Sequence, residues 1–163
     1  MRFAKIENFE IRNGKGIGIS LYTQGCRFHC KNCFNSELWD IFGGKEWTEE
    51  VEDKFISLAS SSYLNRISIL GGEPLIDENL DTIYHLIKRI KEIYPNKKVW
   101  LYSGYTYEEL KNDPKRLKIV EMCDILVEGR YVDELRDLTL KFRGSSNQRI
   151  IDTKLKKDIS EVI

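Results

Sequence analysis

Three of the four cysteines in this 163-residue chain lie within eight residues, at Cys26, Cys30 and Cys33. Three thiolates at this spacing can bind one metal centre when the chain around them folds as a single loop. A closed zinc site takes four protein ligands, and a four-iron cluster is usually held by four cysteines. Three cysteines leave one coordination position free of protein, and metal chemistry takes place at such open positions.

The spacing Cys-x3-Cys-x2-Cys leaves three interpretations open. An iron–sulfur cluster is favoured, because thiolates bind iron strongly and one short loop can enclose one cluster. The second interpretation is a zinc site with Cys123 as a distant fourth ligand. The third is a redox dithiol formed by Cys30 and Cys33. Cys123 itself lies just before an apolar strand, where we expect a buried and inert thiol.

Composition and charge are typical of a soluble globular protein. The chain is 41% hydrophobic and 32% charged, and its 26 lysines and arginines balance 26 aspartates and glutamates. A net charge of zero argues against general nucleic-acid binding. The sequence has no signal-peptide pattern and no run of roughly 18 to 20 apolar residues, so we expect no membrane partner and a cytoplasmic location. In the cytoplasm, cysteines are more often metal ligands or catalysts than disulfides.

Strands and helices alternate along the chain, which predicts an α/β fold. We expect strands at residues 16–22, 66–70, 99–102, 124–128 and 148–153. We expect helices at residues 47–64, 80–94 and 107–122, with a break in the last at Pro114, and a further short helix at the C-terminus. A closed eightfold barrel typically needs about 250 residues. We therefore predict a single domain, residues 1–163, built as a partial (open) β/α barrel with parallel strands.

Polar and glycine-rich motifs follow the expected strands, as the cysteine loop also does. The run Gly71-Gly72-Glu73-Pro74 follows one strand, and Ser103-Gly104 follows the next. The carboxyl ends of parallel strands meet at one rim, where such folds bind their ligands. Paired glycines allow close approach to the backbone, Glu73 offers an acceptor to an ammonium group, and the Ser103 hydroxyl suits a ribose or a carboxylate. An ordinary strand-to-helix turn, with helix capping by Thr106, is the alternative explanation.

The cysteine triplet followed by Gly71-Gly72-Glu73-Pro74 resembles the radical S-adenosylmethionine superfamily. Within it, the chain is similar to the activating proteins of anaerobic (class III) ribonucleoside-triphosphate reductases. The narrower similarity is carried by five segments spread over nearly the whole chain: Thr23–Cys26, Cys33–Asn35, Tyr102–Thr106, Asp124–Tyr131 and Gly144–Gln148. One position departs from the superfamily pattern, because Asn32 stands before the third cysteine, where an aromatic residue is common.

The resemblance implies an enzyme that generates a glycyl radical in a partner protein. Cys26, Cys30 and Cys33 would bind three irons of a 4Fe-4S cluster, whose fourth iron would chelate S-adenosylmethionine. An electron from reduced flavodoxin or a similar donor would cleave this cofactor to a 5′-deoxyadenosyl radical, which takes a hydrogen atom from a glycine of the reductase. Contacts to S-adenosylmethionine are expected from Asn32, Cys33, Phe34, Gly71, Gly72, Glu73 and Ser103.

Two other functions remain open at this point. Activation of another glycyl-radical enzyme, such as pyruvate formate-lyase, would use the same cluster with a different partner. A zinc-stabilised binding module would use the cysteines without catalysis. The basic, polar stretch Arg143–Arg149 is the candidate segment for docking the reductase.

Overall fold

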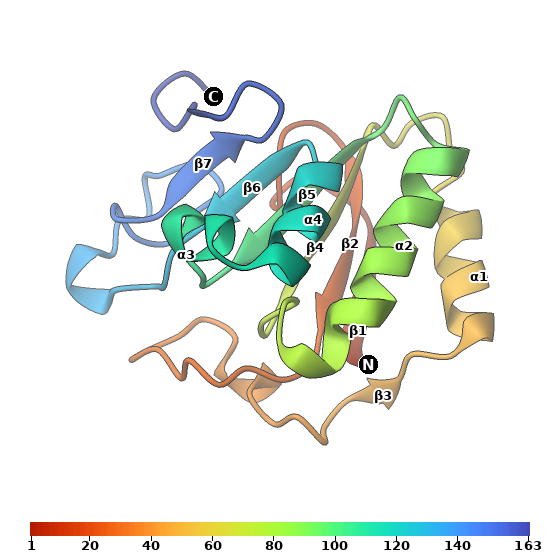
Figure 1. Cartoon of the computed structure of the whole chain (residues 1–163), viewed down its shortest axis with the longest axis horizontal. Coiled ribbons are helices and arrows are strands. Elements are labelled where there is room, and N and C mark those ends of the chain that lie inside the picture. Colours follow the sequence, from red (N-terminus) through yellow and green to blue (C-terminus); the bar gives the residue numbers. More distant parts are fainter.

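The computed structural model describes all 163 residues, and its strands form one eight-stranded sheet with the α-helices packed on one face (Figure 1). The strands are β1 (Arg2–Glu10), β2 (Gly18–Thr23), β3 (Lys45–Glu46), β4 (Arg66–Gly71), β5 (Lys98–Ser103), β6 (Ile125–Glu128), β7 (Arg149–Asp152) and β8 (Lys157–Asp158). The helices are α1 (Glu49–Leu58), α2 (Leu80–Ile93), α3 (Tyr107–Lys111) and α4 (Pro114–Met122). Short 3-10 turns lie at Ser36–Leu38, Asp77–Asn79 and Asp133–Leu135. None of the helices has the length and apolar composition that crossing a membrane requires.

The sheet has the strand order β3-β1-β2-β4-β5-β6-β7-β8, and only its centre is parallel. Strands β2, β4, β5 and β6 run parallel, which confirms the α/β prediction for this part of the chain. The outer strands pair antiparallel with their neighbours, so the prediction of parallel strands is confirmed only for the four central ones. The partial-barrel shape stays a prediction.

Of two further expectations about single elements, one is confirmed with shorter bounds and the other is wrong. The helix expected at residues 47–64 is shorter, because Thr48 caps its start by accepting a hydrogen bond from the Val51 amide and three serines follow its end. The expected C-terminal helix is absent, and the chain forms β8 and turns there. The Asp152 carboxylate accepts hydrogen bonds from two amides just beyond it, which turns the chain back into the sheet.

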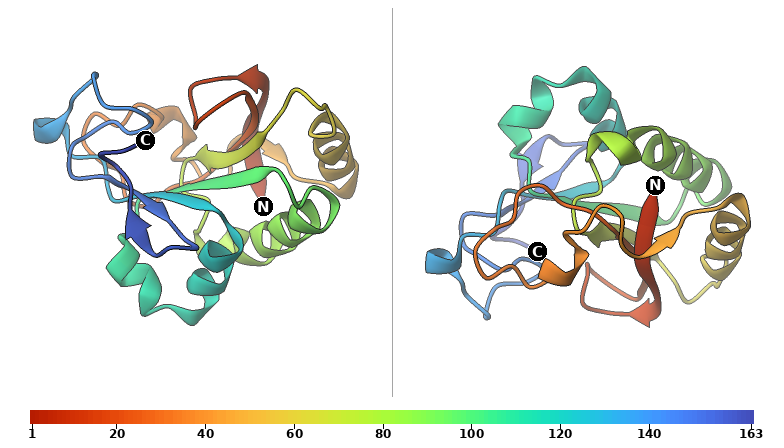
Figure 2. Two further views of the ribbon diagram at one scale, coloured as in Figure 1. Left: turned by 90° about the horizontal axis from the view of Figure 1, so that it is seen from above. Right: turned by 90° about the horizontal axis from the view of Figure 1, so that it is seen from below.

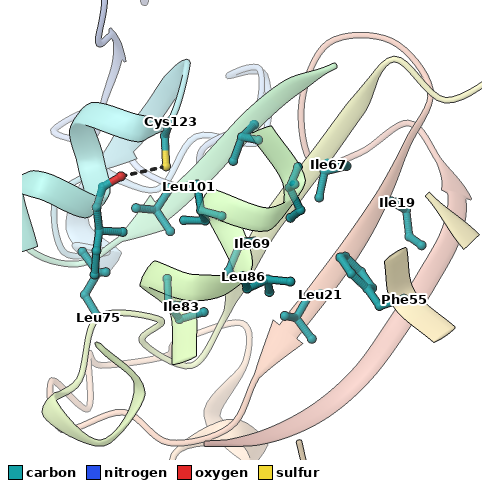
Figure 3. Close-up of a cluster of buried hydrophobic side chains, with 14 of the residues drawn as sticks. Ile19, Leu21, Phe55, Ile67, Ile69, Leu75, Ile83, Leu86, Leu101 and Cys123 are labelled. Carbon is teal, nitrogen blue, oxygen red and sulfur yellow. Dashed lines mark hydrogen bonds between the residues drawn. The ribbon is translucent and has the colours of Figure 1, made fainter. Parts of the chain in front are cut away.

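Alternate residues of the central strands form the main hydrophobic core with the helices (Figure 3). Ile19 and Leu21 of β2 and Ile67 and Ile69 of β4 are fully buried against this layer of helices. Helix α2 contributes its apolar stripe, which consists of Ile83, Leu86, Ile87 and Ile90. Each such side chain stabilises the fold by about 1.5–3 kcal/mol, so the core fixes the strand ends that carry the site.

The second face of the sheet, opposite the helices, holds a buried ion pair that the sequence pattern does not reveal. The Nη1 atom of Arg66 lies 2.6 Å from Oε1 of Glu10 and 2.6 Å from Oγ of Ser68. Arg66 also donates hydrogen bonds to the backbone carbonyls of Glu10, Lys15 and Gly16. These bonds fix the segment between β1 and β2 over the second face.

Candidate metal and cofactor site

The cysteine loop, residues 24–35, follows β2 at the carboxyl edge of the four parallel strands. It lines a cavity of about 390 Å³, here called the strand-end pocket, whose size is typical of ligand sites. The pocket walls include the predicted residues Cys26, Cys30, Cys33, Phe34, Gly71, Gly72, Glu73 and Ser103. Of the predicted site residues only Asn32 is not part of this wall. The fold therefore brings together motifs that lie up to 77 residues apart in the chain (from Cys26 to Ser103).

The three cysteines of the loop are free thiols on one pocket wall. Burial raises the pKa of the Cys26 thiol, and the negative charge of Glu73 adds to the effect. Burial also raises the pKa of the Cys30 thiol. Binding to a metal displaces thiol protons, so such thiols still serve as ligands. No group of three or more histidine, cysteine or acidic side chains is arranged to hold a metal ion in this structure, and the ligand assignment stays a prediction.

Backbone hydrogen bonds attach the start of the cysteine loop to its surroundings. The Gly25 amide donates to the Leu38 carbonyl, and the Cys26 amide donates to the Trp39 carbonyl. The Gly25 carbonyl accepts a hydrogen bond of 2.8 Å from the Glu73 amide. Two non-glycine residues of the loop have positive φ, at 49° for His29 and 56° for Asn32, a conformation that costs energy outside glycine. The loop is thus held in a tightly curved form around the cysteines.

The glycine motif after β4 is required by close backbone packing. A Cβ atom on Gly71, where φ is +121°, would lie 2.4 Å from the backbone of Thr23. A Cβ atom on Gly72 would lie 2.4 Å from the Gly25 carbonyl oxygen. Both glycines therefore allow the motif to lie directly against the chain that enters the cysteine loop. Their predicted contacts with a cofactor remain predictions.

Glu73 joins two strand-end loops through its buried carboxylate. Its Oε1 accepts a hydrogen bond from the Gly104 amide, and its Oε2 accepts from the Ser103 hydroxyl at 2.8 Å and from the Leu75 amide at 3.0 Å. Burial raises the pKa of Glu73 to about 7, although these donors act in the opposite direction. The sequence suggested an acceptor open to an ammonium group, but in the fold both oxygens already have protein partners. Glu73 therefore orients Ser103 and Gly104.

Residues near the third cysteine contact a segment that the sequence analysis did not connect with the site. The Asn32 side chain donates a 2.8 Å hydrogen bond to Asp133, and Asp133 also accepts one from the Tyr131 hydroxyl. The ring of Phe34 lies 4.9 Å from that of Tyr131, between ring centroids. The segment after β6 therefore lies beside the cysteine loop, as Figure 2 shows. Tyr131 ends the segment Asp124–Tyr131 that carries part of the resemblance, but nothing in the sequence places it beside the cysteine loop.

Cys123 lies far from this site in the topology. It precedes β6 at the amino edge of the parallel strands, whereas the cysteine loop follows the carboxyl end of β2. Its thiol is fully buried in the main core and donates a hydrogen bond to the Ile119 carbonyl, as drawn in Figure 3. Burial raises its pKa strongly. The burial of Cys123 expected from the sequence is confirmed, and its position in the core, away from the cysteine loop, argues against a role as fourth zinc ligand.

Polar atoms without partners indicate what the pocket can accept. The indole Nε1 of Trp39, the hydroxyl of Tyr102 and Nε of Arg143 are shielded from solvent and have no hydrogen-bond partner. All three residues line the strand-end pocket. Buried donors of this kind are normally satisfied, so they fit a ligand rich in hydrogen-bond acceptors. The three free thiols fit a thiolate-held cluster, and the unpaired Trp39 indole near them fits a polar organic cofactor.

The structure is a mixed α/β sheet with three free thiols in a pocket at the carboxyl edge of its parallel strands, the arrangement expected of a protein that binds a cluster on a strand-end loop. Comparison with known proteins agrees with this class. The chain belongs to the 4Fe-4S single cluster domain family, whose model matches residues 12–151, and within it to the family of anaerobic ribonucleoside-triphosphate reductase-activating proteins.

Three relatives illustrate this membership, and each is named as an anaerobic ribonucleoside-triphosphate reductase-activating protein. The Vibrio cholerae protein is 34% identical over 152 residues, covering 92% of this chain and 97% of the relative. The Salmonella typhimurium protein is 35% identical over 150 residues, covering 91% and 96%. The protein of Enterobacteria phage T4 is 31% identical over 150 residues, covering 92% and 93%.

Proposed function

We propose that this chain is a radical S-adenosylmethionine enzyme that activates anaerobic ribonucleoside-triphosphate reductase. One observation carries the proposal: three free cysteines of a single loop share one pocket with the glycine motif after β4 and with Ser103 after β5. The names of relatives that match more than nine-tenths of the chain support the choice of reductase. We further propose that residues 1–163 act as one cytoplasmic domain.

Cys26, Cys30 and Cys33 would hold a 4Fe-4S cluster, and the pocket beside them would hold S-adenosylmethionine. When bound, the cluster would pass an electron to S-adenosylmethionine and cleave it reductively. The resulting 5′-deoxyadenosyl radical would abstract hydrogen from a reductase glycine. The electron would come from reduced flavodoxin or a similar donor. No side chain has to act as an acid or a base in this reaction. The chain supplies orientation and a shielded pocket.

The residues around the cysteines have separate roles in this proposal. Gly71 and Gly72 let the cofactor approach the backbone, and Asn32 and Phe34 contribute main-chain contacts next to Cys33. The Trp39 indole donates a hydrogen bond to an acceptor of the cofactor, which would satisfy an otherwise unpaired buried group. Glu73 holds the Ser103 hydroxyl in place, and Ser103 contacts the ribose or the carboxylate.

The test uses protein purified and reconstituted with iron and sulfide without air. With a reductant and S-adenosylmethionine, we expect 5′-deoxyadenosine, and with the reductase we expect a glycyl radical in electron paramagnetic resonance. Cys30→Ser should abolish both signals, whereas Cys123→Ser, a matched change outside the pocket, should retain them. Cleavage that persists in Cys30→Ser would refute the proposal. A radical formed in pyruvate formate-lyase, and not in the reductase, would refute the choice of partner.

A further inference from the structure

The strand-end pocket extends beyond the cysteines across the second face of the sheet. Its far wall includes Asn13, Val127 and Phe142, which lie well outside the predicted cofactor residues. Five buried polar side-chain atoms in the whole chain lack a hydrogen-bond partner, and three of them line this pocket. Such groups are rare in folded proteins and call for a specific explanation. Trp39 belongs to the cysteine end, whereas Tyr102 and Arg143 lie in contact with the far wall.

Tyr102 occupies the floor of this extension. Its ring packs against two small apolar clusters, one containing Tyr22, Leu38 and Leu70 and the other containing Trp100, Val127 and Ile150. Its hydroxyl is shielded from water and unpaired, and burial raises its pKa well above the ordinary value. The hydroxyl therefore stays protonated and remains a donor at every physiological pH. An unsatisfied buried hydroxyl destabilises the protein, and a bound acceptor would relieve this cost.

Arg143 approaches the same space from the loop between Arg136 and Ser145, here called the 136–145 loop. A β-bridge closes this loop at its base, and the Phe142 ring packs edge-on against Trp100 at 5.3 Å between centroids. The Arg143 guanidinium makes no ion pair and no hydrogen bond, and its Nε is shielded from water. Two arginines near the pocket differ in this respect, since Arg130 pairs with Glu109 and Arg149 pairs with Glu128.

Two exposed apolar side chains line the pocket at this end. Leu138 on the 136–145 loop is 75% exposed, and Phe34 of the cysteine loop is 51% exposed. A small cofactor inside the pocket leaves such a rim in water, whereas a protein bound over the mouth covers it. The rim is therefore better matched to a macromolecular ligand than to a second small molecule.

We propose that Tyr102 and Arg143 form a peptide site, which binds an extended main-chain segment of the partner reductase. The Tyr102 hydroxyl and the Arg143 guanidinium donate to peptide carbonyls, since an extended chain presents one such acceptor per residue. Leu138 and Phe34 cover the flanking surface of the partner. This assignment rests on the proposed function, because that function supplies a protein substrate, and it deepens it by naming the residues that recognise the substrate.

The test measures dissociation constants with cluster-reconstituted protein, separately for the anaerobic reductase of the same organism and for S-adenosylmethionine. We expect Tyr102→Phe to weaken reductase binding about fivefold and Arg143→Gln about tenfold or more, consistent with loss of a neutral and a charged hydrogen bond. Affinity for S-adenosylmethionine should fall less than affinity for the reductase. Tyr63→Phe and Lys141→Gln are matched controls at exposed positions outside the pocket wall, and both should bind the reductase like the unaltered protein.

The peptide site is refuted if both pocket variants bind the reductase normally, or if they weaken S-adenosylmethionine binding as much as reductase binding. The second result would mean that Tyr102 and Arg143 donate their hydrogen bonds to the cofactor.

Unaltered protein that cleaves the cofactor without binding the reductase refutes the peptide site and the choice of partner. The proposed cofactor chemistry is not affected by that result. Unaltered protein that fails to cleave the cofactor, with reductase binding still sensitive to both variants, refutes the proposed chemistry and supports the peptide site.

Discussion

The Oε1 atom of Glu73 accepts a hydrogen bond of 2.7 Å from the backbone amide of Gly104, across 31 residues of chain. This bond connects the loop after β4 with the loop after β5, and the Glu73 amide in turn connects both to Gly25 in the cysteine loop. Three loops of the pocket wall are therefore joined through one residue, two of them by its side chain and the third by its backbone amide. A change at Glu73 should be felt at every part of the pocket and in the stability of the fold.

Glu73 makes folding stability depend on pH. Burial raises its pKa from 4.5 to about 7, so the folded protein keeps a proton that the unfolded chain has already released in this range. The free energy of unfolding should therefore fall as pH rises from 4.5 to about 7, by roughly 3 kcal/mol from this group. Glu73→Gln should lack this contribution, as denaturant unfolding between pH 4.5 and 8 can measure.

The matched control for this change is Glu92→Gln, an exposed glutamate in α2. The control should show the same pH dependence of unfolding as the unaltered protein. If Glu73→Gln and Glu92→Gln gave the same dependence, the protonation of Glu73 would not contribute to stability.

Gly104 makes room for the cysteine loop. A Cβ atom at this position would lie 2.6 Å from the Phe28 ring, which also contacts Tyr105 and carries the Arg130 guanidinium over its face. Gly104→Ala should destabilise the protein by about 1–3 kcal/mol through this overlap. A double-mutant cycle with Phe28→Ala should show that removing the ring relieves much of this cost. Additive losses of unfolding free energy would contradict a direct clash.

The buried pair of Arg66 and Glu10 should be costly to break from one side. Arg66→Met leaves the Glu10 carboxylate buried without its partner, so we expect a loss of about 3–5 kcal/mol in unfolding free energy. Arg66→Met combined with Glu10→Leu should lose less than Arg66→Met alone. Arg12→Met is the control, since Arg12 pairs with Glu7 at the surface and should cost less than about 1 kcal/mol. A double variant with a lower free energy of unfolding than Arg66→Met alone would contradict this explanation.

Cys123 should matter for stability and not for metal binding. Its side chain is fully buried in the main core, and Cys123→Ala leaves a small cavity that should cost about 1–3 kcal/mol. The iron content of anaerobically reconstituted protein should stay at the value of the unaltered chain. A loss of bound metal in folded Cys123→Ala would show that the thiol is a ligand after all.

The sequence predicted the parts of the fold that depend on local pattern. The apolar runs of β2, β4, β5 and β6 and the glycines after them mark strand ends directly, so the shared rim could be predicted before the fold was known. Strand β1 was missed because it is irregular, with register shifts between Phe3 and Lys5 and between Glu7 and Glu10. A bulge moves side chains to the other face and hides the alternation that identifies a strand.

The remaining features depend on tertiary structure. The sequence predicted Glu73 as a site residue, but its hydrogen bonds to Ser103 and Gly104 depend on how two strand ends meet. Tyr102 sits in an apolar strand and Arg143 in an irregular polar stretch, so their convergence on one pocket has no local signal. Arg66 begins an apolar strand, and only the segment folded over it shows why a charge is buried there.

The most direct test of the account is the iron and sulfide content of protein handled entirely without air. We predict about four irons and four sulfides per chain, bound through Cys26, Cys30 and Cys33, and a loss of most of this content when any one of the three is changed to serine. One zinc per chain with no sulfide, or a full complement of iron in the serine variants, would contradict the assignment of these cysteines as the ligands of an open four-iron cluster.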